Sequence, residues 1–184
     1  MSDLNGAESL VHTLADSGVD LCFANPGTSE MQFVDALDRT KLMRCVLGLF
    51  EGVVTGAADG YARMAQKPAV TLLHLAPGFA NAAANLHNSR KARVPMLNLV
   101  GDHALRHQKY DAPLSADVES ACAPFSDWVR SGRDAGSFAA DAMTALAVAK
   151  SKPGKIASLI APADIGWDAG GKMAAVVAPH AAAP

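Results

Sequence analysis

The alternation of short apolar runs with helical patterns constrains the fold of this chain more than any other feature. Strand-like runs occupy residues 19–24, 43–50, 69–75, 95–101, 127–131 and 155–162. Between them, apolar residues recur at helical spacing, as at Leu10, Val11 and Leu14. Crossovers between strands of this kind are right-handed and join parallel strands that are covered on both faces. The sequence therefore predicts an α/β fold with a doubly wound, mostly parallel sheet of about six strands.

The length and composition are those of one folded domain followed by a tail. Half of the 184 residues are hydrophobic, which is enough for one α/β core but not for two large ones. After Trp167 and Asp168 the sequence consists mainly of Gly, Ala and Pro and has no periodicity. We predict a domain over residues 1–168 and a linker-like tail over residues 169–184.

Charge and cysteine content exclude several classes of function. Sixteen Lys and Arg oppose eighteen Asp and Glu without a basic run, so we expect neither a nucleic-acid partner nor a membrane surface as partner. The N-terminus lacks a basic and then apolar leader, which favours a soluble, cytoplasmic protein. The three cysteines are widely spaced, and we expect buried, unreactive thiols rather than a disulfide or zinc framework. The histidines show no ligand spacing, so no metal site is predicted.

Polar clusters follow four of the predicted strands. They are the turn Asn25, Pro26, Gly27 and Thr28, the acid Glu51, His74 with the loop ending in Gly78, and the segment Gly101 to His103. Ligands of an open parallel sheet bind beyond the carboxyl ends of its strands, and all four clusters belong to that edge. Turn formation alone explains Asn, Pro, Gly and Asp at such positions. Glu51 and His74 are not turn formers, which favours a functional site.

Glu51 begins a predicted helix that carries a stripe of glycines. Gly52, Gly56 and Gly60 recur at every fourth position, although glycine destabilises a helix interior by about 1 kcal/mol relative to alanine. Such a stripe permits close approach of another backbone, either the sheet of the same domain or a second subunit. Glu51 itself lies where the helix dipole favours a carboxylate, so N-terminal capping is an alternative to a chemical role.

The segments NPGTSE, FEGVVTGAADGYAR and LHLAPGFANAAANLHNSRKARVPMLNLVGDH together carry a family resemblance. Over residues 4–168 the chain resembles the N-terminal pyrimidine-binding domain of thiamine diphosphate enzymes, in the group of acetolactate synthase and benzoylformate decarboxylase. The resemblance implies that Glu51 hydrogen-bonds N1′ of the cofactor's aminopyrimidine and so promotes removal of the C2 proton. A 2-oxo acid would then be decarboxylated, or its fragment joined to a second carbonyl compound.

Other site residues are implied by the same resemblance. Asn25, Pro26, Gly27 and Thr28 match a turn that lines the cofactor and substrate pocket, with Thr28 in place of a serine. His74 matches an active-site histidine that transfers protons, whereas without the resemblance it would read as a buried core histidine. Gly78 belongs to a loop that is similar to the Gly-Pro-Gly loop of the carboligases. We assign no chemistry to Asn81, Asn85 or Asn88.

One departure from the family pattern limits what this chain can do alone. The family binds Mg²⁺ and the diphosphate through a second domain with a G-D-G motif followed by asparagine, and this sequence lacks that pattern. We therefore expect half of a cofactor site, from an excised domain or from the small subunit of a split enzyme. Expected partners are the missing pyrophosphate-binding domain and a second copy of the chain, bound through the glycine stripe. The alternative is a non-catalytic dimerisation or binding module, and the use of FAD is left open.

Overall fold

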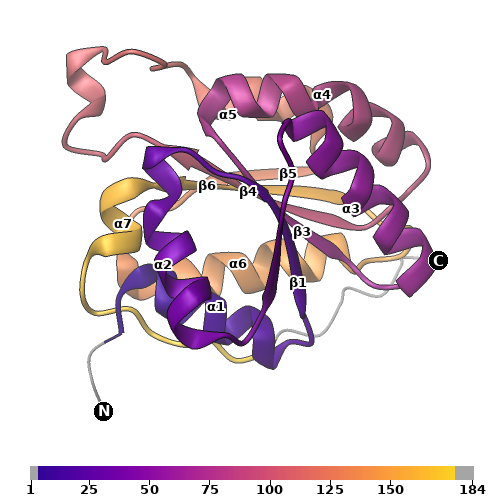
Figure 1. The fold of residues 1–184 in the computed structure, drawn as a ribbon, viewed down its shortest axis with the longest axis horizontal. Helices are drawn as coiled ribbons and strands as arrows, with labels where there is room; N and C mark the ends of the chain where they lie inside the picture. Colours follow the sequence, from indigo (N-terminus) through magenta and orange to yellow (C-terminus); the bar gives the residue numbers. More distant parts are fainter. Residues whose placement is uncertain (1–3, 177–184) are drawn as a thin grey trace.

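A computed structural model describes residues 4–176 and contains a six-stranded sheet in which every neighbouring pair is parallel (Figure 1). The strands are β1 (Leu21–Asn25), β2 (Arg44–Leu47), β3 (Ala69–Leu73), β4 (Met96–Asp102), β5 (Trp128–Ser131) and β6 (Ile156–Pro162). Their order across the sheet is β2-β1-β3-β4-β6-β5. From β1 the chain passes to β2 on one side and then to β3 on the other side, so the strand order reverses between β1 and β3. This reversal confirms the predicted doubly wound α/β architecture.

Helices cover both faces of the sheet (Figure 1). They are α1 (Gly6–Asp16), α2 (Met31–Thr40), α3 (Glu51–Ala65), α4 (Leu75–Lys91), α5 (Val118–Cys122), α6 (Ala135–Ala149) and α7 (Ala163–Trp167). Short 3₁₀ turns lie at Thr28–Glu30, Gln108–Tyr110 and Ala123–Phe125. Helices α1, α2 and α6 pack on one face, and α3, α4 and α5 pack on the other. Within residues 4–176, no helix combines the length and the apolar composition needed to span a membrane.

The hydrophobic core consists of two layers, one on each side of the sheet. Phe33 and Phe138 are buried in the layer under α1, α2 and α6, and Phe79 and Leu86 are buried in the layer under α3 and α4. Every residue of β3, β4 and β6 is buried, as expected for central strands covered on both faces. Burial on both faces explains why these three strands are near-continuous apolar runs in the sequence.

A row of hydrogen-bonded polar side chains crosses the centre of this otherwise apolar sheet. Thr71 on β3 donates to the side chain of Asn98 on β4 (2.7 Å), and Asn98 donates to Ser158 on β6 (3.1 Å). Ser158 in turn pairs with Ser126 at 2.8 Å. The three strand residues face one another directly in the register, so the row fixes how the strands align.

Two predicted boundaries differ from the structure. Strand β3 ends at Leu73, two residues before the end of the predicted run over residues 69–75, and α4 already begins at Leu75. Pro77 lies in the first turn of α4, where its missing N–H costs no intrahelical hydrogen bond, so the Ala-Pro-Gly segment is helical rather than a separate loop. Strand β2 is also shorter than the predicted run over residues 43–50, because the chain leaves the sheet after Leu47.

The position of β2 at the sheet edge corrects the expectation that all cysteines are buried. Cys22 on β1 and Cys122 on α5 are buried, but Cys45 on β2 is exposed. Edge strands are covered on fewer sides than central ones, and the residues of β2 are mostly exposed. All three thiols are free, as expected.

The glycine stripe of α3 faces α4 at one end only. Asn85 of α4 donates a hydrogen bond to the carbonyl oxygen of Gly52, and a side chain at Gly56 would contact the same asparagine. Gly56 and Gly60 are nevertheless exposed, and nothing lies within 4 Å of the place that a side chain at Gly60 would occupy. A Cβ atom at Gly52 would lie 2.4 Å from the ring of Phe50, so packing within the described chain explains this glycine and leaves the far end of the stripe open.

The first part of the predicted tail is attached to the domain. Ala169 forms an isolated bridge with Asn5, and the backbone N–H of Gly171 donates to the carbonyl of Leu4. Ala174 donates to the hydroxyl of Thr13 on α1. Residues 177–184 of the predicted linker lie outside the described residues.

The polar row across the sheet leads to a stability prediction. Replacing Asn98 with Leu keeps the size of the side chain but leaves the buried hydroxyl of Thr71 without its partner. We expect the free energy of unfolding to fall by about 1–3 kcal/mol, the usual cost of an unsatisfied buried polar group. Chemical denaturation measures this loss. The matched control is Asn88→Leu on the exposed surface of α4, and equal effects of the two changes would contradict the assignment.

Candidate functional site

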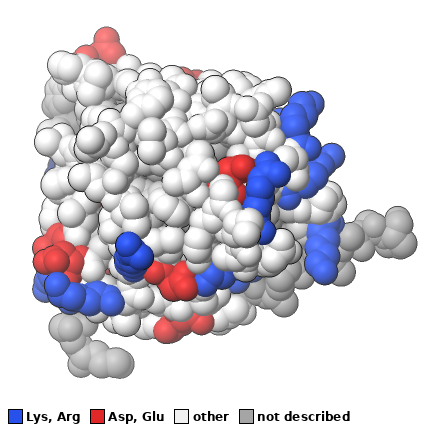
Figure 2. All heavy atoms as spheres, turned by 45° about the vertical axis from the view of Figure 1, so that its right-hand side comes forward, with Lys and Arg blue, Asp and Glu red and all other residues white. Residues whose placement is uncertain are grey.

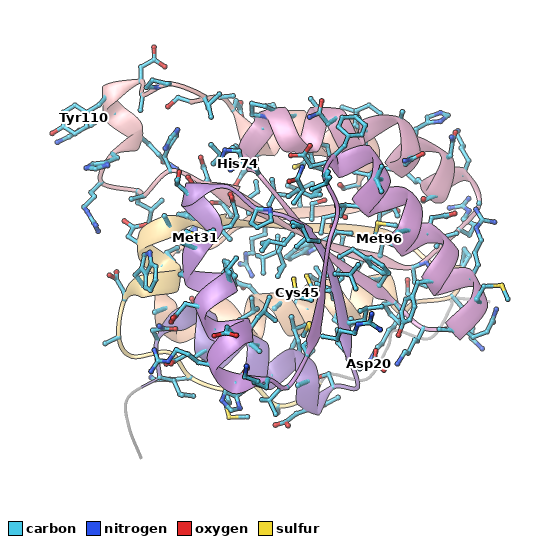
Figure 3. The ribbon with its side chains drawn as sticks, viewed as in Figure 1. Asp20, Met31, Cys45, His74, Met96 and Tyr110 are labelled. Carbon is cyan, nitrogen blue, oxygen red and sulfur yellow. The ribbon has the colours of Figure 1, made fainter. Side chains whose placement is uncertain are left out.

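The carboxyl ends of the central strands bring several of the predicted polar residues together. Asn25 at the end of β1 is the register partner of Leu73 on β3, and Leu73 is the register partner of Val100 on β4. The residues that follow these strands are therefore neighbours at one edge of the sheet. Figure 3 shows His74 at this edge and Asp20, which precedes β1, at the opposite edge.

His74 pairs with a buried glutamate that the sequence analysis did not select. The Nδ1 atom of His74 lies 2.7 Å from Oε2 of Glu30, whose side chain is fully buried. The same carboxylate oxygen accepts the backbone N–H of Gly27 at 2.7 Å. The imidazole is partly exposed, so its pairing through Nδ1 leaves Nε2 as the ring nitrogen available to a ligand.

Glu30 lies directly against the backbone of β4. A side chain at Gly101 would place its Cβ 1.5 Å from Oε1 of Glu30, so only glycine permits the acid to occupy this position. Burial raises the pKa of Glu30, while the N–H groups of Gly27 and Leu75 and the imidazole of His74 lower it. Oε1 is buried without a hydrogen-bond partner among the described residues. Such an orphan acceptor is costly and is typical of a functional site.

The backbone between β3 and α4 is strained beside this pair. Leu75 has a left-handed φ of 53°, a conformation that apolar non-glycine residues rarely adopt. Its N–H is close enough to Glu30 to lower the pKa of that carboxyl group. Strained residues of this kind cost about 1–3 kcal/mol and gather at active sites and ligand clamps.

Glu51 forms the second centre of the site. It is the first residue of α3 and is only 6% exposed, although the adjacent Leu49 and Phe50 are exposed. Its Oε2 atom accepts a hydrogen bond from the side chain of Asn81 on α4 at 2.9 Å. The carboxylate thus reaches across to the neighbouring helix, and no side-chain cap of α3 is formed at Phe50.

Gly78 allows the Glu51 carboxylate to approach the backbone of α4 closely. A Cβ atom at position 78 would lie 2.6 Å from Oε1 of Glu51, which is closer than such atoms approach. The N–H of Gly78 donates to the carbonyl of His74, so the first turn of α4 connects the two centres. The site therefore combines a buried acid held between two helices with an accessible imidazole nitrogen.

The remaining predicted residues lie around these two centres. Asn25 ends β1, Pro26 and Gly27 form the connection to the 3₁₀ turn, and Thr28 is exposed at the start of that turn. A Cβ atom at Gly27 would meet the ring of His74, so this turn contacts the imidazole directly. Asp102 and His103 instead line a separate hollow of about 470 Å³ together with Asp117 and Ser131.

Sequence reasoning missed two members of the site, Glu30 and Asn81. Glu30 was not selected, although it lies five residues after the end of β1 and belongs to the same edge as His74. Asn81 received no role, although it lies one helical turn after Gly78. Within residues 4–176, no cluster of three or more His, Cys, Asp or Glu residues could hold a metal ion.

Comparisons with known proteins agree with this geometry. The family model for the N-terminal TPP-binding domain of thiamine pyrophosphate enzymes matches residues 4–121. The chain is 57% identical over 180 residues to a protein of Mycobacterium tuberculosis named "Putative acetolactate synthase large subunit IlvX", and this match covers 98% of the chain and 35% of that protein. Benzoylformate decarboxylase of Pseudomonas aeruginosa is 37% identical over 84 residues, which cover 46% of this chain and 16% of the enzyme.

Solved structures show the same fold. A thiamine diphosphate-dependent 4-hydroxybenzoylformate decarboxylase of Rhodococcus jostii superposes with a TM-score of 0.84 at 24% identity, covering 93% of this chain and 32% of the enzyme. The chain thus spans about a third of the length of this enzyme and of the mycobacterial relative. The family match extends over more than half of the chain and includes Glu51, His74 and Glu30. This chain belongs to the thiamine pyrophosphate enzymes, as their N-terminal TPP-binding domain.

Proposed function

We propose that this domain is the pyrimidine-binding half of a thiamine diphosphate-dependent enzyme that acts on a 2-oxo acid, with Glu51 as the residue that activates the cofactor. The observation that carries the proposal is the buried Glu51 carboxylate, which is oriented by Asn81 and packs against Gly78. A ring nitrogen of a heterocycle is a suitable partner for such a carboxylate, because a hydrogen bond that is shielded from water is strong. When bound, thiamine diphosphate supplies a carbon nucleophile that stabilises the carbanion left by decarboxylation.

Glu51 would hold and release a proton at its carboxylate. A carboxylate that is shielded from water interacts more strongly with one bound hydrogen-bonding group, because solvent does not compete for the proton. Asn81 donates to Oε2 and leaves Oε1, the oxygen that faces Gly78, for the ligand. In this arrangement Asn81 fixes the orientation of the acid.

His74 would move protons on the substrate side of the site. Glu30 engages Nδ1 and therefore sets which ring nitrogen faces the ligand. Nε2 can then donate a proton to, or accept one from, a group bound near the turn of Asn25, Pro26, Gly27 and Thr28. The exposed hydroxyl of Thr28 is a second polar group available to a substrate carboxylate.

A second domain or subunit would complete the site and cover an exposed apolar surface next to Glu51. Leu47, Leu49, Phe50 and Val53 are 48–90% exposed, and they run from the end of β2 into the first turn of α3. On the face that includes α3, uncharged residues occupy most of the centre and upper part of the molecule (Figure 2). We place the diphosphate and Mg²⁺ on that second domain, which would dock here, and a second copy of the chain against the open end of the glycine stripe. Large apolar patches of this kind typically mark an interface.

The domain alone should bind thiamine diphosphate weakly. It offers residues for the pyrimidine but lacks the family pattern that binds the diphosphate and metal, so most of the charge of the cofactor would remain in water. Isothermal titration calorimetry with cofactor and Mg²⁺ should give no saturable heat at micromolar concentrations. A tight isotherm that depends on Mg²⁺ would contradict the proposed half-site.

Replacing Glu51 with Gln should separate cofactor binding from cofactor activation. With the pyrophosphate-binding domain supplied, we expect binding to survive and proton exchange at the cofactor C2 carbon to slow on the order of 10²- to 10⁴-fold, because the amide cannot shuttle a proton. Deuterium exchange followed by NMR measures the rate, and Glu119→Gln on the exposed surface is the matched control. Unchanged exchange together with a lower melting temperature would assign Glu51 a structural role only.

The protonation of Glu30 should appear in the pH dependence of stability. Burial raises the pKa of Glu30 above its ordinary value of 4.5, so the folded domain holds this proton more tightly than the unfolded chain. The stability that the proton contributes is complete below pH 4.5 and is lost as the pH rises through the raised pKa. Relative to Glu30→Gln, the wild type should therefore lose stability above pH 4.5.

Denaturant titrations at a series of pH values measure this difference. The comparison of the wild type with Glu30→Gln is repeated in proteins that carry His74→Gln and so lack the imidazole. If the pH dependence of the stability difference disappears there, it belongs to His74. A difference that is independent of pH in both backgrounds would contradict the shifted pKa of Glu30.

A further inference from the structure

Two of the three cysteines occupy facing positions on neighbouring strands. Cys22 on β1 and Cys45 on β2 are direct partners in the parallel register, so their side chains leave the sheet on the same face. Neighbouring strands lie about 4.7–4.9 Å apart, and disulfides join Cα atoms that are about 4.4–6.8 Å apart. The backbone spacing therefore permits a bridge between these two residues.

The two cysteines differ in their access to solvent. The Cys22 thiol donates to the carbonyl oxygen of Phe23 at 3.7 Å. Cys22 is buried in the core between the sheet and helices α1 and α2, whereas Cys45 lies on the exposed edge strand. The pair thus has one member that solvent can reach and one that it cannot.

A surface hollow gives access to Cys45. It has a volume of about 470 Å³, and its lining includes Leu37, Met43, Lys41 and Arg44 as well as Cys45. The charged groups that line it are Asp38, Lys41 and Arg44. Figure 3 places Cys45 beside β1, in the part of the molecule between the sheet and α2. A small molecule can therefore reach Cys45 from solvent.

We propose that Cys45 and Cys22 form a redox-active pair that a low-molecular-weight disulfide converts into an intrachain disulfide. In the first step, the Cys45 thiolate attacks one sulfur of the oxidant R–S–S–R, which forms a mixed disulfide and releases one R–S⁻. In the second step, Cys22 loses its proton to solvent and attacks Sγ of Cys45, which releases the second R–S⁻. The two cysteine thiols are oxidised by two electrons, and the oxidant is reduced to two thiols.

The electrostatics of the pair agree with this order of events. The neighbouring thiol of Cys22 lowers the pKa of Cys45 to about 7, so a large part of this thiol is the nucleophilic thiolate at neutral pH. The neighbouring Cys45 and burial raise the pKa of Cys22 well above its ordinary value. Cys122 provides an internal comparison, because burial raises its pKa to about 12 and it lies in the core layer on the other face of the sheet.

The disulfide would connect the edge strand β2 to β1, a few residues before Glu51 in the sequence. Strand β2 leads through residues 48–50 to Glu51 at the start of α3. Closure of the disulfide would fix the end of the sheet from which that segment departs. Formation of this disulfide does not depend on the proposed cofactor chemistry, because it involves only residues within the described chain.

Oxidation with glutathione disulfide followed by intact-mass spectrometry tests the proposal. The reduced chain should lose the mass of two hydrogen atoms, and proteolytic digestion without reductant should yield a peptide pair that links Cys22 to Cys45. Cys22→Ala should stop at the glutathione adduct on Cys45, Cys45→Ser should form neither product, and Cys122→Ser should behave as the wild type. A wild type that ends as the glutathione adduct, or that does not react, would overturn the proposal.

The rate of the first step gives a second, independent measurement. In the wild type it should reach half its plateau near pH 7, the pKa of Cys45. Removing the Cys22 thiol should return the pKa of Cys45 towards its ordinary value of 9.0. Cys22→Ala should then react about fivefold more slowly at neutral pH, since the loss of thiolate exceeds the gain in nucleophilicity. Equal rates in the two proteins would show that the thiols do not interact, and the mass of the wild-type product decides the proposal even if Cys22→Ala does not fold.

Discussion

The buried carboxylate of Glu30 organises the carboxyl edge of the sheet. It accepts a hydrogen bond from the N–H of Gly27 and pairs with His74, so it connects the segments that follow β1 and β3. It also lies against Gly101 on β4, where any larger residue would displace it. Removing a carboxylate from water is costly, and these donors offset part of that cost. The orientation of the His74 ring follows from this one group.

The two buried acids of the site have different surroundings, which suits them to different tasks. Glu51 begins α3, accepts a hydrogen bond from Asn81 and is 6% exposed. Glu30 is fully enclosed, pairs with an imidazole, and has its pKa raised by burial. An acid at the margin of the domain can act on a ligand, as we propose for Glu51, whereas an enclosed acid acts only through its neighbour. The proposed division between a reacting acid and an orienting acid comes from the fold, because the residue type is the same.

The sequence predicts the architecture well, since the evidence for it is local. Apolar runs with short helical segments between them specify parallel strands, and the rule for ligands at carboxyl ends places Glu51 and His74 at one edge. Glu30 and Asn81 were missed because their roles depend on contacts across 44 and 30 residues, respectively, which no spacing along the chain reveals. The exposure of Cys45 was missed for a similar reason. An apolar run resembles a central strand until the strand order places it at the edge.

The surroundings of Glu51 are asymmetric. On the inner side the acid is enclosed by α4 and reaches 6% exposure without any ligand. On the outer side Leu49 and Phe50, its neighbours in sequence, are 90% and 48% exposed. Burying an apolar side chain contributes about 1.5–3 kcal/mol, so a surface of this kind is stabilised when a second domain covers it. The same docking would remove water from the open side of the Glu51 carboxylate. We therefore expect a single docking event both to cover the apolar surface and to exclude water from the Glu51 carboxylate.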